Sequence, residues 1–400
     1  MFYFLSKKSY YSRKYTDVPE LKMSEKMTLA DVLKGDFDFS ETGKRSASEG
    51  KTGRTIEAGK VYLPKNGNAY PDEAPEIDIP VKGRKGKKGA SDERRLISFV
   101  NTIARSSPFG RAVLEDAARD GFTLTMENQK DSCGFCDKES KIIALNPVLS
   151  DSLLVATLAH ESRHAQQFAR GAEDAFGVFN LKGEIMYTRA MEADAETAAA
   201  ATCHEIRINS GNDGPWKDFS EDSVEIANGF MTAAPSRNAP VNDKMLQGAF
   251  NGWYRDVAMM EAYEEGYISD TMHYAMKHPK EGMPDYDKNV KSEDVVALFC
   301  SNAKGKCYWA DNPQVLNERD KLSISADTYN TAQRFFEVRE MRTGKKPDPS
   351  LDEVDVRLDL FTQGRRADKE NAVKAFSIKG PKKNVIDARI ASSVIQKKQR

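Results

Sequence analysis

The stretch "LLVATLAHESRHAQQFARG", residues 153–171, restricts the possible folds of this chain more than any other. Its apolar spacing predicts a helix, and on that helix His160 and His164 lie four residues apart, on the same face. Two imidazoles placed in this way can reach a single metal ion. The alternative is an ordinary helix whose two histidines are exposed or satisfied within a packed core.

Residues His160 to His164 match the pattern His-Glu-x-x-His. Glu161 follows His160 and is turned about 100° from it around the helix axis. Its carboxylate is therefore expected beside a bound ion rather than on it, where a general base for a metal-bound water is needed. A further alternative keeps the metal without any activity.

A catalytic zinc site needs a third protein ligand and leaves a fourth position to water. The alanine-rich segment 184–207 predicts a long helix with a small-residue face, which can pack closely on the first helix. It carries Glu192, Asp194 and Glu196. Glu192 and Glu196 share a face, so one can bind metal while the other holds a ligand histidine, an outer role that Asp194 can also fill. The alternative is a solvated helical face.

The other helices and the strands are predicted from the spacing of apolar residues and from helix-capping residues. Ser107 is expected to cap one helix, while Ser150 or Asp151 caps the histidine helix and Gly171 ends it. The predicted order is helix, helix, strand, strand, helix, over residues 92–106, 107–121, 122–127, 141–147 and 150–171. Further helices are predicted over residues 220–234, 244–268, 292–303 and 328–342.

These elements predict an α+β, mainly helical domain over residues 92–345, with a small sheet before the histidine helix. Residues 1–91 have few apolar positions at any regular period, so we expect a largely disordered region that closes in the basic linker "KGRKGKKG". Residues 346–400 are expected to form a basic tail. Its last forty residues hold eleven basic and three acidic side chains.

Charge and composition exclude several classes of partner and location. The net charge of −1 provides no global field toward nucleic acid, and no apolar run is long enough to span a membrane. The N-terminus does not have the form of a cleaved secretory signal. We therefore expect a cytoplasmic protein, or one exported as a bacterial effector without a cleaved signal. The oligomeric state is left open.

Five cysteines spread over the chain do not suggest a secreted disulfide framework. Cys133, Cys136, Cys300 and Cys307 could together supply four thiolates to a structural zinc. The simpler interpretation is that Gly134 and the following phenylalanine form a hairpin turn flanked by cysteines.

The segments "TLAHESRHAQQ" and "RAMEADAETAA" resemble the zincin metallopeptidases of the glutamate-ligand type, over roughly residues 92 to 260. They are also similar to bacterial proteins described only as "putative metallopeptidases". In that clan the third ligand is usually a glutamate with Asp or Asn four residues later. This chain departs from the pattern, because Glu196 stands four residues after Glu192.

The resemblance implies peptide-bond hydrolysis at Zn²⁺ held by His160, His164 and Glu192, with Glu161 as general base. It also implies that the edge strand of the sheet pairs with an extended protein or peptide substrate, and residues 141–147 stand where that strand would precede the active-site helix. The competing function is a catalytically inactive zincin-like interaction protein that binds a partner through its basic segments. A donor to the oxyanion is also expected, with four candidates: Tyr254, Tyr263, His273 and Tyr274.

Overall fold

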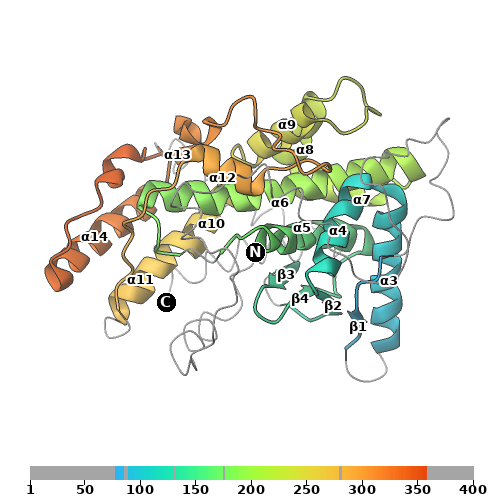
Figure 1. Cartoon of the computed structure of the whole chain (residues 1–400), viewed down its shortest axis with the longest axis horizontal. Helices are drawn as coiled ribbons and strands as arrows, with labels where there is room; N and C mark the ends of the chain where they lie inside the picture. Colours follow the sequence, from blue (N-terminus) through green and yellow to red (C-terminus); the bar gives the residue numbers. More distant parts are fainter. Residues whose placement is uncertain (1–76, 85–88, 130–131, 174–175, 279–281, 358–400) are drawn as a thin grey trace, which may run out of the picture.

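The long helix α6 (Leu181–Ser210) runs through the middle of the molecule, and α5 (Asp151–Ala169) lies along it (Figure 1). The computed structural model describes residues 77–84, 89–129, 132–173, 176–278 and 282–357. Ser150 caps α5 as predicted, its hydroxyl accepting a hydrogen bond from the backbone N–H of Leu153. Gly211 ends α6 in the left-handed region, with φ +72°.

The predicted small-residue face of α6 is confirmed by its packing. Ala198, Ala199, Ala200 and Ala201 are all buried, as are nearly all other residues in the middle of the helix. A methyl side chain takes little space, so α6 can receive neighbours on every side. Besides α5, the helices that pack most extensively against it are α4 (Pro108–Arg119), α7 (Gly214–Asp222), α9 (Asp243–Trp253) and α12 (Ser292–Phe299).

A four-stranded sheet lies beside α5 and α3 (Gly89–Ser106) in the order β1-β2-β4-β3 (Figure 1). Its parallel pairs are β1 with β2 and β2 with β4, in the registers Val81↔Leu124 and Thr123↔Ile142. β3 pairs antiparallel with β4. The strands are β1 (Val81–Lys82), β2 (Thr123–Met126), β3 (Gly134–Asp137) and β4 (Ile142–Leu145).

Two predictions about this sheet are wrong. The strand in 141–147, which is β4, is an inner strand between β2 and β3 rather than the edge. Gly134 does not form a turn but begins the edge strand β3. A Cβ at Gly134 would lie 2.8 Å from the carbonyl oxygen of Ala144 and 2.9 Å from Cγ2 of Thr157. Glycine is therefore needed here for close packing of β3 on β4 and α5.

The predicted helix over 244–268 is broken into three elements. α9 ends at Trp253, α10 (Val257–Tyr263) starts again with Asp256 as its cap, and a π-helical turn, η2, follows. Asp256 accepts a hydrogen bond from the N–H of Met259, which favours the start of a new helix at this point over the continuation of α9. The remaining elements are α8 (Val224–Thr232), η2 (Glu264–Ser269), α11 (Asp270–Lys277), η4 (Val315–Asn317), α13 (Arg319–Leu322), α14 (Ala326–Thr343) and η5 (Pro349–Glu353).

The packed region extends past both boundaries expected from the sequence. At the start, β1 precedes residue 92, and Arg84 forms an ion pair of 2.7 Å with Asp92. At the end, Val356 forms a parallel bridge with Ile324. The disorder predicted for the N-terminal region and the basic tail concerns residues that mostly lie outside the described part: 1–76, 85–88 of the linker, and 358–400. Of the helices within the described ranges, none is long and apolar enough to cross a bilayer.

Candidate metal centre

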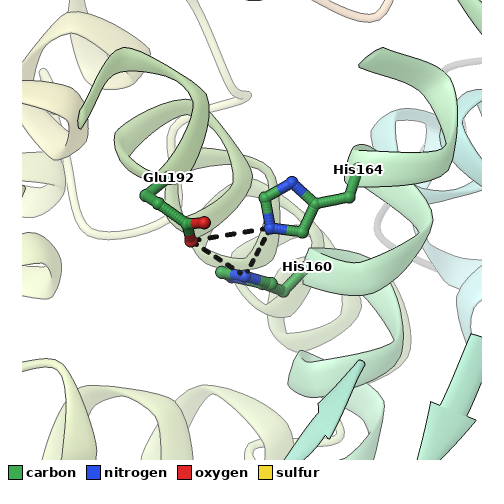
Figure 2. Close-up of side chains that lie close together, drawn as sticks. All are labelled: His160, His164 and Glu192. Carbon is green, nitrogen blue, oxygen red and sulfur yellow. Dashed lines mark hydrogen bonds and ion pairs between the residues drawn. The ribbon is translucent and has the colours of Figure 1, made fainter. Parts of the chain in front are cut away.

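His160 and His164 on α5 face Glu192 on α6 (Figure 2). The two Nε2 atoms are 3.0 Å apart, and Oε2 of Glu192 lies 3.6 Å from that of His160 and 3.5 Å from that of His164. All three side chains are buried. In the described part of the chain this is the one group of His, Cys, Asp and Glu side chains with a spacing suited to a metal ion.

The tautomer of His164 follows from Gln167, which the sequence did not single out. Both amide hydrogens of Gln167 are used, because Nε2 donates to the carbonyl of Met191 at 2.9 Å and to Oδ2 of Asp194 at 2.8 Å. Its Oε1 therefore accepts from Nδ1 of His164, at 2.9 Å. This leaves the lone pair of Nε2 on His164 directed at Glu192 and His160.

Glu196 has the same relation to His160. Its Oε1 lies 3.3 Å from Nδ1 of His160, so the proton of this ring sits on Nδ1 and Nε2 faces the group. Burial alone would lower the pKa of His160. The negative charges of Glu196, Glu161 and Glu192 outweigh burial and raise that pKa to about 9, so a cation that binds Nε2 has to displace a proton from this nitrogen.

The two carboxylate oxygens of Glu192 have different surroundings. Oε1 accepts a hydrogen bond of 2.5 Å from the hydroxyl of Tyr267, whereas Oε2 accepts none from the described residues. Burial would raise the pKa of Glu192, but His164 and His160 hold it well below its usual value. A buried carboxylate oxygen and two imidazole lone pairs thus converge on one point, where a cation would satisfy all three.

Glu161 is 2% exposed and lies beside this group. Its Oε2 has no hydrogen-bond partner among the described residues. Burial raises its pKa, an effect opposed by the adjacent His160 and His164. A Cβ at Gly134 would lie 3.3 Å from Cγ of Glu161, so the edge strand β3 runs next to this carboxylate.

A second polar cluster lies behind the histidines, between the same two helices. Arg163 pairs with Asp194 through two hydrogen bonds, of 2.7 Å from Nε and 2.9 Å from Nη2. Nη2 also donates to the carbonyl oxygens of Phe299 and Ser301. Tyr308 donates to Oδ1 of Asp194 at 3.0 Å. Asp194 therefore does not contact a ligand histidine directly. It supports His164 through the side chain of Gln167, which bonds to both.

The four candidate oxyanion donors lie in different places. Tyr263 stacks on Tyr267, whose hydroxyl binds Glu192; burial and the charges of Glu192 and Glu196 raise the pKa of Tyr263 well above the usual value. Tyr254 instead packs on Phe250 and Trp253. The remaining two are on α11, where His273 is exposed and Tyr274 stacks on His278 at 4.0 Å.

The four thiolates do not come together as a metal site. Cys133 and Cys136 flank or lie in β3, while Cys300 and Cys307 lie around the end of α12 and the loop after it. All are free cysteines, and none belongs to the one metal-type group of the described residues. Burial raises the pKa of the Cys307 thiol to about 11, which disfavours the thiolate form.

Three side chains that contact the predicted site residues were missed from the sequence: Arg163, Gln167 and Tyr267. Arg163 and Gln167 do carry a local signal, since they are three and seven residues after His160 and share a face of α5. Tyr267 carries none, because its contact with Glu192 spans 75 residues and depends on the π-helical turn.

Residues 72–309 match the family described as "Putative metallopeptidase family (DUF6782)". The match covers more than half of the chain, so the chain belongs to this family. The predicted metallopeptidase class is thereby confirmed at the level of the family, and such a family implies a metal ion. Searches of curated proteins and of solved structures find no match.

Proposed function

We propose that this member of the metallopeptidase family is a zinc-dependent peptidase of the glutamate-ligand zincin type. The observation that carries the proposal is the convergence of the Nε2 atoms of His160 and His164 on Oε2 of Glu192, a buried oxygen without a hydrogen bond from the described residues. Two imidazoles and one carboxylate are a ligand set of catalytic zinc sites. Their outer partners Glu196 and Gln167 orient both rings.

When bound, zinc would polarise the scissile carbonyl and lower the pKa of a coordinated water toward about 7. Glu161 then acts as the general base. It accepts the proton of the attacking water and passes it to the leaving amine, which balances the hydrolysis of one peptide bond to a carboxylate and an amine. Burial raises the pKa of Glu161, which makes it a stronger base than an exposed glutamate.

The proposed substrate is an extended protein or peptide segment that pairs with the edge strand β3. β3 is at the end of the sheet next to Glu161, so an added strand would pass the catalytic group. Tyr263 is the best placed of the four candidate donors for the carbonyl oxygen, because it is partly exposed and lies beside Glu192.

Metal content tests the ligand set. Purified full-length protein is expected to hold one zinc per chain, and a variant with both His160→Ala and His164→Ala is expected to hold none. Elemental analysis of dialysed protein measures both. Wild-type protein that takes up no zinc from a zinc-containing buffer would overturn the proposal.

Glu161→Gln separates catalysis from metal binding. The variant should keep its zinc and lose about 10² to 10⁴-fold in kcat/KM on an unfolded protein substrate, since general base catalysis is worth that much. Glu184→Gln is the matched control, because Glu184 is also buried with an oxygen that lacks a hydrogen bond from the described residues, while its other oxygen accepts from the backbone N–H of Gly177. Unchanged activity in Glu161→Gln would remove this residue from the role of base. Absence of cleavage by zinc-loaded wild type would favour an inactive interaction protein.

A further inference from the structure

The π-helical turn η2 interrupts an otherwise α-helical run between α10 and α11. π-helical turns are rare and often occur at functional sites. This one carries Glu264 and Tyr267, both buried, and both contact α6.

Two parallel contacts join η2 to α6. Tyr267 binds Glu192 at 2.5 Å, and three residues earlier on each element Glu264 forms an ion pair of 2.5 Å with Arg189. Oε2 of Glu264 also accepts from the backbone N–H of Ser325 at 2.9 Å. Residues three apart lie on one face of a helix, so the two contacts fix both the height and the rotation of η2 along α6.

The ring of Tyr267 is fixed from both sides. It stacks on Phe176 with a centroid distance of 5.2 Å and on Tyr263 with 5.5 Å, at interplanar angles of 23° and 28°. Stacked aromatic rings lose few conformations when they make a polar contact, because their side chains are already ordered. The phenol hydroxyl is therefore held in one direction, toward Oε1 of Glu192.

We propose that Tyr267 is a positioning residue that makes Glu192 a ligand through one oxygen only. By occupying Oε1, the phenol leaves Oε2 to face the two imidazoles. Without it the carboxylate can rotate and present both oxygens, or turn away. This inference rests on the proposed zinc site and adds to it the group that sets the ligand's orientation.

Zinc affinity of the metal-free full chain, measured by competition with a chelator, tests the inference with the metal alone as probe. Tyr267→Phe is expected to weaken zinc binding about 10 to 100-fold, the usual effect of losing an outer partner of a ligand. The d–d spectrum of the Co²⁺-loaded variant should also change, because the coordination number or geometry changes. Tyr187→Phe is the control: this buried tyrosine of α6 bonds to the backbone of Glu173 instead.

The possible outcomes separate the two proposals. Wild-type protein without metal affinity would overturn the proposed function and this inference with it. If the wild-type protein binds zinc and Tyr267→Phe has the same zinc affinity and the same Co²⁺ spectrum, the inference alone is overturned. Thermal unfolding of the metal-free variant checks its fold. Should it fail to fold, Phe176→Leu loosens the ring but keeps the hydroxyl, and a several-fold loss of affinity is expected; full affinity there would contradict the inference.

Discussion

Two buried polar clusters join α5 to α6, and they differ in how completely they are satisfied. The first cluster, here called the metal group, consists of His160, His164, Glu192 and the neighbouring Glu161. In it, Oε2 of Glu192 and Oε2 of Glu161 accept no hydrogen bond from the described residues. In the cluster behind it, both oxygens of Asp194 and all three nitrogens of the Arg163 guanidinium have partners. Burial of charge alone therefore does not mark a ligand site; the unpaired oxygen beside two imidazoles is the feature that supports the proposed one.

Gln167 connects the two clusters. Its carbonyl accepts from His164 while its amide donates to Asp194, so the paired cluster serves as the rigid support of the unpaired one. Such a support reduces the freedom of His164 before any ligand arrives. A support that stabilises the fold and a group that binds a metal should respond differently to mutation.

The largest expected effect on stability follows from Arg163→Met. It leaves the buried Asp194 carboxylate without its cation, and breaking a buried pair in this way costs about 3 to 5 kcal/mol. Urea unfolding of the metal-free protein measures the change. Arg111→Met, which breaks a partly exposed pair with Glu115, should cost only about 0.5 kcal/mol. Equal losses in the two variants would contradict the distinction.

A smaller, pH-dependent effect is expected from Glu184, a buried carboxyl of α6 without imidazole neighbours. Burial raises its pKa to about 8, so the folded protein keeps it protonated where the unfolded chain, with a pKa near 4.5, ionises it. The contribution of this carboxyl to the free energy of unfolding is full below pH 4.5 and is lost as the pH rises to about 8.

Glu184→Gln should remove this loss and raise stability at pH 8 by on the order of 2 kcal/mol, since each pKa unit corresponds to about 1.4 kcal/mol and relaxation reduces the total. Unfolding free energies at pH 5 and pH 8 give the comparison. Zinc content should stay at the wild-type level. A variant that loses zinc would show that Glu184 belongs to the metal group after all.

The smallest effect in free energy is expected from Gln167→Leu. Loss of the acceptor for Nδ1 of His164 should weaken zinc binding about tenfold, equal to about 1.4 kcal/mol. Gln166→Leu is the neighbouring control, because Gln166 bonds to Arg163 and Asp116 but to neither histidine. If Gln166→Leu weakens zinc binding as much, the whole support rather than Gln167 sets the affinity.

Several local features could be predicted from the sequence because their causes are local. Helix period and the caps at Ser107 and Ser150 depend on neighbouring residues, and the structure confirms both helices and both caps. The edge strand β3 was missed because its four residues, with a glycine first, carry little strand signal. Its place is decided by close packing of Gly134 on Ala144 and Thr157.

That His160 and His164 share a face, with Glu161 beside them, follows from the sequence alone, since four residues make about one helical turn. It also placed three carboxylates on a second helix. The choice among them depends on helix packing: the rotation of α6 against α5 puts Glu192 at the imidazoles, Glu196 beside Nδ1 of His160 and Asp194 on Arg163. That rotation depends on packing between residues far apart in the chain, which no local pattern encodes.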